Sequence, residues 1–383
     1  VFAYHFYRLI QRAGEVHLVY NTEANDIGGG EKSRFIQQML HEMPGYNPRV
    51  KFTEKIESLP APEKASVIPI KVDKTDKVFQ KLITMAQKGL SPTTINRYRR
   101  CALQFYLQDI VQLDESEEVE ETLEARTIGI IVHDALEKLY LPYEGRQIFR
   151  HDIVVLEKKL EDQLADSFLK HYAQGEIRFG KNRLIFEVIR KFMTSFFSFE
   201  KEFLKEMEAE GSKLEIRKLE ERIEVFVKLP TGGLDVKLKG TIDRVDELNG
   251  VPRIIDYKTG VVEPRELSLA DWENFLDGNK LDKAFQVLMY AWLYQKFYKV
   301  DNPEFETGVI SLRKLSNGFV KFGFKPEGSR TKDTLVDGPV LQQFEQYLEQ
   351  VLEELFDKEI PFEQTKDVEV CERCNFGVLC SRV

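Results

Sequence analysis

Two aspartates stand on a hairpin whose turn can be identified from the sequence. Asn249-Gly250 is a strong hairpin signal because type I′ turns require positive φ at both central residues. If these residues form the loop, Leu248 pairs with Val251, and the same register places Asp243 opposite Asp256. Cross-strand partners have Cβ atoms about 5 Å apart on one face. The carboxylates would repel each other there, and a divalent cation between them would reverse the sign of that interaction.

Lys258 follows Asp256 by two residues, so it projects from the same face of the strand. Carboxylate oxygens suit Mg²⁺, and a bound metal both acidifies water and polarises a phosphate. A lysine can orient the attacking water or stabilise charge that builds on the phosphate. The alternative is an exposed hairpin with ordinary surface charges, which the apolar Ile254 and Ile255 before Asp256 disfavour. We therefore predict that Asp243, Asp256 and Lys258 are catalytic.

The segments Gly240-Thr-Ile-Asp-Arg-Val-Asp246 and Ile254-Ile-Asp-Tyr-Lys-Thr-Gly260 resemble the core of the RecB-type PD-(D/E)XK nucleases. Gly129-Ile-Ile-Val-His133 resembles the helix of that family whose histidine is a metal ligand. Gln286-Val-Leu-Met-Tyr290 resembles its Q-x-x-x-Y motif, with both side chains on one helix face.

The resemblance implies a restriction-endonuclease-like α/β fold, a mixed sheet flanked by helices. It also implies DNA as the substrate and Mg²⁺ or Mn²⁺ as the metal. Its metal ligands would be His133, Asp243 and Asp256, with Gln286 and Tyr290 supporting the active site and DNA binding. Taken alone, the histidine would more often be a packed or surface residue, and the other two would be unremarkable.

The four cysteines are too few for a secreted disulfide scaffold of this length. Three lie within ten residues, which favours a metal site in a reducing cytoplasm. Four thiolates hold iron–sulfur clusters or structural zinc, and reduced, buried cysteines without metal are the third possibility. The four residues are Cys101, Cys371, Cys374 and Cys380.

One cysteine before the nuclease core and three after it resemble the AddB subunits of bacterial AddAB helicase–nucleases and related CRISPR-associated nucleases. That resemblance implies a [4Fe–4S] cluster on the four cysteines, which joins both ends of the domain like a clasp, and an AddA-like helicase–nuclease partner. Arg100-Cys-Ala-Leu-Gln-Phe-Tyr106 fits the segment around the first cysteine, except that Ala102 stands where a proline is common. The chain has no G-x-x-x-x-G-K-[ST] phosphate loop, so we expect no ATP hydrolysis by it alone.

The net charge of −9, from 55 basic and 64 acidic residues, counts against a simple nucleic-acid-binding protein. A nuclease needs only a local basic groove. The acidic run over residues 114–121 is more typical of a solvated segment. No apolar run reaches 18 residues, so we expect no membrane span. The local basic groups are Arg97, Arg99 and Arg100; Lys181, Arg183, Arg190 and Lys191; and Lys237 with Lys239.

The chain divides into three parts by its patterns. Residues 1–52 resemble a fragment of a preceding helicase-like domain, with a buried strand over Glu15–Tyr20 and a helix over Glu31–Met43. Residues 53–90, with several prolines and charges, are expected to be a connector. Residues 91–383 are expected to form one α/β nuclease domain. Because the sequence opens on neither a signal peptide nor a methionine, it reads as a piece of a longer protein.

The nuclease domain is expected to open at Ser91-Pro92, a matched helix start signal. Further helices are predicted near residues 127–140, within 151–210, and near 281–298 and 338–357. Alternating apolar residues from Ile223 onward predict a three-strand meander that ends at Lys258. Two short strands are expected near residues 308–312 and 319–324.

Three functions remain open from the sequence. The leading one is the exonuclease module of an AddB-like repair subunit that cuts DNA delivered by a helicase. A free-standing CRISPR-associated type of exonuclease is the second, and the apparently incomplete N-terminal segment counts against it. A non-catalytic DNA-binding clamp is the third, and the intact set of His133, Asp243, Asp256 and Lys258 counts against that.

Overall fold

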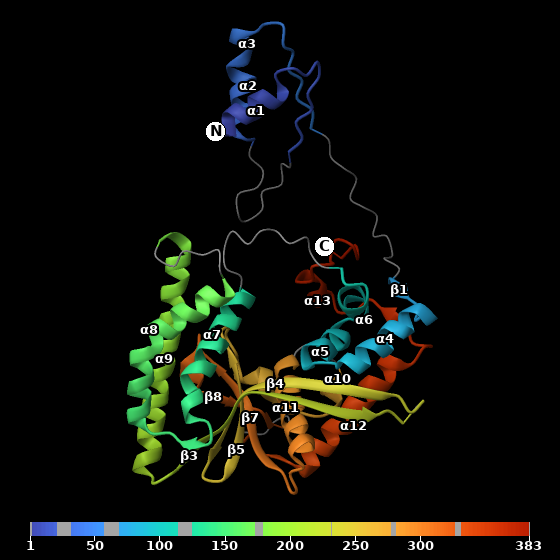
Figure 1. Ribbon diagram of the computed structural model, residues 1–383. Coiled ribbons are helices and arrows are strands. Elements are labelled where there is room, and N and C mark those ends of the chain that lie inside the picture. Colours follow the sequence, from blue (N-terminus) through green and yellow to red (C-terminus); the bar gives the residue numbers. More distant parts are fainter. Residues whose placement is uncertain are drawn as a thin grey trace. The chain divides into compact units, whose positions relative to one another are not determined.

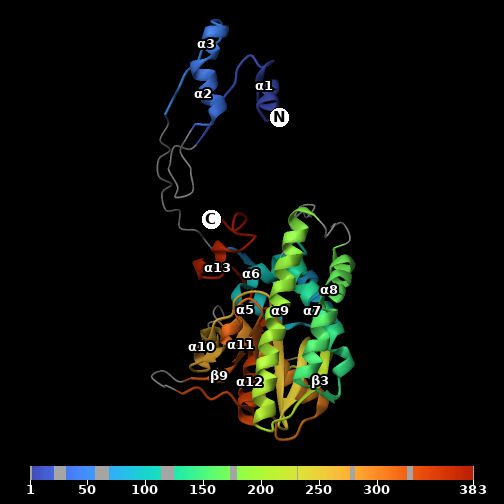
Figure 2. The same ribbon diagram turned by 90° about the vertical axis from the view of Figure 1, so that its left-hand side faces the viewer.

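The computed structural model describes residues 2–20, 32–56, 69–113, 125–172, 179–230, 232–276, 281–325 and 331–382. The chain forms two compact units, residues 1–67 and residues 68–383 (Figures 1 and 2). The acidic run at 114–121 lies outside the described residues. Within the described part of the chain, no helix is both long enough and apolar enough to cross a membrane.

The first unit is small and helical, with α1 (Phe2–Ile10), α2 (Arg34–His41) and α3 (Met43–Tyr46). The helix expected over residues 31–43 is confirmed by α2. The strand expected over Glu15–Tyr20 is wrong, because these residues form no strand and Val19 is 94% exposed. A strand needs a partner for its backbone hydrogen bonds, and none of the described residues of this unit offers one.

The second unit begins inside the segment that we expected to be a connector. Strand β1 (Lys71–Val72) pairs with β11 (Phe362–Glu363), and α4 (Asp76–Lys88) buries Leu82 and Ala86 completely. Lys74 Nζ donates hydrogen bonds to two carbonyl oxygens at the end of α12 (Gly338–Phe356). Residues 71–88 therefore belong to this unit. The partners of Lys74 lie about 280 residues along the chain and α4 packs on β4 (Asp235–Leu248), so composition alone did not reveal them.

A mixed sheet forms the centre of the second unit, with the strand order β10-β7-β5-β4-β3-β2 and β8 paired to β7. The predicted meander is confirmed as β3-β4-β5, and β5 then pairs in parallel with β7. The first strand of the meander begins at Leu214 rather than Ile223. The bounds are β2 (Arg146–Gln147), β3 (Leu214–Lys228), β4 (Asp235–Leu248), β5 (Val251–Lys258), β7 (Glu304–Ser311), β8 (Phe319–Lys321) and β10 (Val336–Asp337), with β6 (Ser268–Leu269) paired to β9 (Gly323–Phe324) in a separate small sheet.

Helices cover both faces of this sheet (Figures 1 and 2). One face packs against α7, α8 and α9, and the other packs against α4, α5, α11 and α12. The neighbouring residues Ile254 and Ile255 point to opposite faces, one into each apolar core. The helices are α5 (Pro92–Arg100), α6 (Ala102–Phe105), η1 (Tyr106–Ile110), α7 (Ala125–Tyr140), η2 (Leu141–Tyr143), α8 (Arg150–His171), α9 (Gly180–Ala209), η3 (Pro264–Leu267), α10 (Glu273–Leu276), α11 (Asp282–Tyr298), η4 (Leu315–Asn317), α12 (Gly338–Phe356) and α13 (Val368–Glu372).

The predicted helices and the hairpin register are confirmed. Ser91 caps α5 by accepting a hydrogen bond from the backbone of Thr94. Asn249 and Gly250 take φ values of 52° and 90°, as a type I′ turn requires. The strands pair from Leu248 with Val251 to Arg244 with Ile255. This register carries the next residues along the strands, Asp243 and Asp256, toward each other.

Candidate active site

The carboxylates of Asp243 and Asp256 are both buried, at 7% and 2% exposure. Backbone pairing between β4 and β5 stops one residue short of them, at Arg244 and Ile255. Beyond that point, Asp243 Oδ2 accepts a hydrogen bond of 2.6 Å from the backbone N–H of Tyr257. A side chain thus replaces a backbone partner at the place where the two strands separate.

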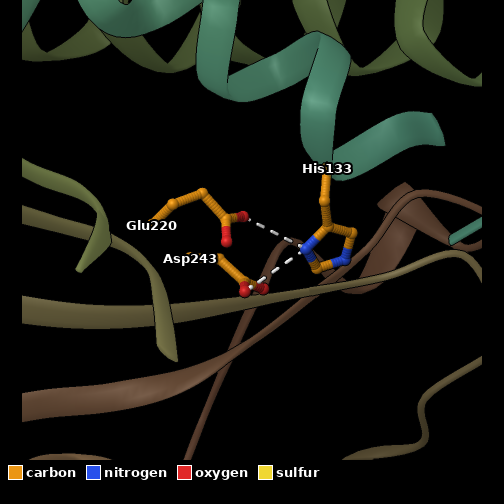
Figure 3. A group of neighbouring side chains, drawn as sticks. All are labelled: His133, Glu220 and Asp243. Carbon is orange, nitrogen blue, oxygen red and sulfur yellow. Dashed lines mark ion pairs between the residues drawn. The ribbon is translucent and has the colours of Figure 1, made fainter. Parts of the chain in front are cut away.

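His133 reaches the same place from α7. Its Nδ1 lies 3.3 Å from Asp243 Oδ1 and 3.4 Å from Glu220 Oε1, while its Nε2 lies 3.1 Å from the carbonyl oxygen of Tyr257. Figure 3 shows the two carboxylates converging on the imidazole from separate segments of the chain. One donor atom from each of the three side chains lies within 4.8 Å of the others.

Glu220 is a member of this group that the sequence reasoning missed. It lies opposite Asp243, between the pairs Leu219 with Arg244 and Glu221 with Ile242. Its φ of 43° is rare for a residue with a side chain and marks local backbone strain. The sequence carried a signal, because the apolar alternation of β3 breaks on both sides of Leu219. A broken alternation indicates an irregular strand, which often adjoins a site.

Lys258, Asp256 and Gln286 form a second, adjoining group. Lys258 Nζ lies 2.9 Å from Asp256 Oδ2 and donates to Asp256 Oδ1 at 3.2 Å and to Gln286 Oε1 at 3.1 Å. Gln286 Nε2 donates to Asp256 Oδ1 at 2.9 Å and to Tyr290 Oη at 2.8 Å. The structure therefore brings together all six residues that the nuclease-like motifs indicated, although their roles stay predictions.

The close approach of α11 to β4 depends on Gly240. A Cβ atom at this position would lie 2.9 Å from Tyr290 Cε1 and 3.0 Å from Leu293 Cδ1, closer than real Cβ contacts. The absence of a side chain on Gly240 lets Tyr290 pack directly over the strand. That packing places Gln286, one helical turn earlier, beside Asp256 and Lys258.

Burial and clustered charge shift the pKa values of the site. Burial alone would lower the pKa of His133, but ion pairs with Asp243 and Glu220 raise it to about 11. Burial raises the pKa of Asp256 to about 6, against the opposing effect of the Lys258 ammonium group. Burial also raises the pKa of Glu220. Without a metal, the protonated imidazole of His133 is the positive charge that balances the carboxylates of Asp243 and Glu220.

The donor set fits a divalent metal ion. Carboxylate oxygens suit Mg²⁺ and Mn²⁺, and an imidazole nitrogen is also a ligand for Mn²⁺. Within the described ranges, His133, Glu220 and Asp243 are the one group of three such donors this close together. Asp256 Oδ2 is buried and has no hydrogen-bond partner, although its ion pair with Lys258 is short. This oxygen faces the Lys258 ammonium group, so a metal ion in the site would share it with that charge.

All four cysteines line one small, largely apolar cavity, together with Leu107, Gln364 and Phe376. Burial raises the pKa of the thiols of Cys371 and Cys380. Among the described residues, no three of these sulfur atoms all lie within 4.8 Å of one another. Tetrahedral zinc requires sulfur atoms about 4 Å apart. The structure therefore shows neither a closed zinc site nor the expected clasp, although it gathers the cysteines from both ends of the unit.

Most of the basic groups that were expected to offer a DNA groove form ion pairs with acidic residues of the chain. Arg97 pairs with Asp109, and Lys237 pairs with Glu224. Arg183 and Arg190 both pair with Glu187. Arg99 is buried among aromatic rings. The charge of most of these groups is therefore partly balanced within the protein.

Comparison with known proteins agrees with this geometry. The family model described as the PD-(D/E)XK nuclease superfamily matches residues 89–381. No curated protein matches the chain. The matched span contains the meander, the helices α7 and α11, and every residue of the site described above. The chain therefore belongs to the PD-(D/E)XK nuclease superfamily.

Proposed function

We propose that this protein is a metal-dependent deoxyribonuclease that hydrolyses phosphodiester bonds. The observation that carries the proposal is the convergence of His133, Glu220 and Asp243 beside the Lys258–Asp256 pair. Superfamily membership supports the reaction class, since its members are typically metal-dependent nucleases. DNA as the substrate rests on the motif resemblance.

His133, Asp243 and Asp256 would hold a Mg²⁺ or Mn²⁺ ion, and Glu220 adds a fourth donor. When bound, the metal would acidify a water molecule and polarise the scissile phosphate. Lys258 lies against Asp256, and its ammonium group would stabilise negative charge that builds on a phosphate bound at this metal. The amide of Gln286 hydrogen-bonds to both Lys258 and Asp256, which restricts the lysine side chain to this conformation.

The experiment compares wild type with Asp256→Asn in a cleavage assay on single- and double-stranded DNA, with and without Mn²⁺. We expect cleavage by the variant to fall by a factor of about 1,000 or more, since the metal and Lys258 both lose a partner. Asp235→Asn, at an exposed position of the neighbouring strand β4, is the matched control and should cleave normally. Wild-type cleavage by Asp256→Asn would contradict the proposal.

Stability separates this loss from misfolding. Because the pKa of Asp256 is raised to about 6, its charged form opposes folding as pH rises through that value. Asparagine removes this penalty, which is at most about 3 kcal/mol for a two-unit shift. The metal-free variant should therefore melt at or above the wild-type temperature at neutral pH. If wild type itself cuts no DNA but binds it, the non-catalytic clamp is the better description.

We further propose an AddB-like role as an exonuclease module in double-strand-break repair, working beside an AddA-like subunit in the cytoplasm. Support comes from the four cysteines, which are free thiols around one cavity and match the AddB-like order. We assign this cavity to a [4Fe–4S] cluster. The test is the visible spectrum and iron content of protein purified without oxygen. Zinc in place of iron, or no metal at all, would contradict the cluster and leave the nuclease assay unaffected.

A further inference from the structure

A network of buried charges lies on the face of the sheet opposite Asp243 and Asp256. Arg244 is fully buried, and its Nη1 donates to Glu200 Oε1 at 2.8 Å and to Tyr257 Oη at 3.2 Å. Its Nη2 lies 2.7 Å from Asp246 Oδ2 without hydrogen-bond geometry. The guanidinium also lies 5.3 Å from the ring centre of Tyr140. Burying a charge is costly unless it is paired. A buried arginine with several partners at this position therefore indicates a specific structural role.

The network joins four elements. Glu200 comes from α9, Tyr140 from α7, Arg244 from β4 and Tyr257 from β5. Tyr140 Oη donates to Glu200 Oε2 at 2.5 Å, so the glutamate receives one bond from α7 and another from β4. The helix that carries His133 is thereby tied to the strands that carry Asp243 and Asp256.

Tyr257 connects this network to the candidate metal site. Its side chain points to the buried face and contacts Arg244 and Phe196. Its backbone N–H donates to Asp243 Oδ2, and its carbonyl oxygen lies 3.1 Å from His133 Nε2. Both main-chain groups face the gap where β4 no longer pairs with β5, so two metal-site side chains contact the main chain of this one residue.

We propose that Arg244, held by Glu200, is a positioning residue for the metal site and acts through Tyr257. The guanidinium fixes the ring of Tyr257, the ring fixes the main chain of this residue, and its N–H and carbonyl groups orient Asp243 and His133. Arg244 directly follows Asp243 in the chain, so it also anchors the end of the ladder from which that carboxylate projects. This inference rests on the proposed function, because it concerns the same metal site.

The test is Mn²⁺ binding, measured by calorimetry, in the double variant Arg244→Met/Glu200→Gln. The two changes remove one charge of each sign, and the Asp246–Arg253 pair keeps its two hydrogen bonds. Groups that orient metal ligands typically change metal affinity by 10- to 100-fold. We expect binding to weaken by about 10-fold or more, with cleavage partly restored by added Mn²⁺, since misplaced ligands bind at higher concentration.

Two further variants make the result specific. Leu160→Ala removes a buried side chain from the same apolar core without touching the network, so it should lower the melting temperature and leave Mn²⁺ affinity unchanged. Tyr257→Phe removes only the hydroxyl and should weaken binding by about 3-fold or more, a fraction of the 10- to 100-fold range for such groups. If the double variant does not fold, Tyr257→Phe decides.

Wild-type Mn²⁺ affinity in a folded double variant, or in Tyr257→Phe when the double variant is unfolded, would overturn the positioning role. Equal loss of affinity in Leu160→Ala would also overturn it, because general destabilisation would then explain the effect. A wild-type protein that binds no Mn²⁺ would overturn the proposed function itself, and this inference with it. The two failures are therefore distinguishable.

Discussion

His133 is the residue whose surroundings depend most on whether a metal is bound. In the structure its imidazole lies between two carboxylates. These ion pairs raise the pKa of His133 to about 11 against the effect of burial, so the imidazole is in its charged, doubly protonated form. A metal ion binds only the neutral imidazole. A metal that enters the site must therefore displace this proton.

Metal affinity should consequently rise with pH. Between about pH 6 and pH 8, each unit of decrease should weaken Mn²⁺ binding by up to about tenfold, because one histidine proton is displaced per metal. Protonation of Asp256, whose pKa is about 6, steepens the loss at the acidic end. Titration of wild type in buffers of increasing pH measures this slope, and excess Mn²⁺ should restore cleavage at low pH. A His133→Ala protein that binds Mn²⁺ as tightly as wild type would show that the imidazole is no ligand.

Gly240 gives a second prediction at the scale of one residue. Gly240→Ala places a methyl group against Tyr290 and Leu293, so the tyrosine and the adjoining Gln286 must shift. Displacing the groups that hold Lys258 should lower kcat by about 10-fold or more, with Mn²⁺ affinity nearly unchanged. Gly260→Ala is the matched control, since its Cβ would meet nothing within 4 Å. Equal kcat values for the two variants would contradict the argument.

At the scale of elements, the position of α11 relative to α5 determines where Gln286 lies. Asn96 on α5 donates to the carbonyl oxygen of Asp282 at the start of α11. Arg99, also on α5, lies over the rings of Phe275, Phe285 and Tyr347 and donates to the carbonyl oxygen of Phe275. One cation thus joins α5, α10, α11 and α12.

Arg99→Met should lower the free energy of unfolding by about 3 kcal/mol or more. The substitution keeps an apolar stem but removes charged hydrogen bonds of about 1.5–3 kcal/mol each and the cation–π contacts. Denaturant unfolding measures the change. Arg222→Met, at an exposed position of β3, should alter stability by about 0.5 kcal/mol or less. If both substitutions changed the free energy of unfolding by a similar, small amount, the guanidinium group of Arg99 would contribute little to stability beyond the packing of its apolar side-chain carbons.

At the scale of the whole second unit, the two ends of the chain segment are held together. Strand β1 pairs with β11, and Cys101 shares its cavity with the three cysteines near the C-terminal end. These contacts close a loop of about 270 residues. Cross-links across loops of this length remove on the order of 4–5 kcal/mol of unfolded-chain entropy in one model.

Cys101→Ala should therefore lose the proposed cluster's iron and colour, lower the melting temperature and expose residues after Phe362 to proteases. Cleavage should fall through instability, while Mn²⁺ affinity at low temperature stays close to wild type, because none of the thiols touches the metal site. Phe362→Ala is the control, since it removes a fully buried ring from the same junction and should lower stability with full iron content. Full iron content in Cys101→Ala would show that another residue completes the cluster.

Local chemistry alone determined the meander, its register and much of the site. Asn249 and Gly250 select their turn by backbone preference, and a period of two then assigns each residue of the hairpin to a face. Those two rules suffice to bring Asp243 toward Asp256 and Lys258 beside it. Ser91 and Pro92 likewise determine where α5 begins, because capping depends only on neighbouring residues.

Only the tertiary structure decided which residues from distant segments contact the hairpin and the helices around it. Glu220 reaches His133 because an irregular stretch of β3, with a positive φ, turns its carboxylate toward α7. Arg99 was expected to belong to a basic DNA groove, yet its side chain is buried in a core assembled from distant segments. Residues 71–74 join the second unit through partners near the other end of the chain. The physical reason is that burial and charge pairing depend on which segments pack together, which local patterns do not specify.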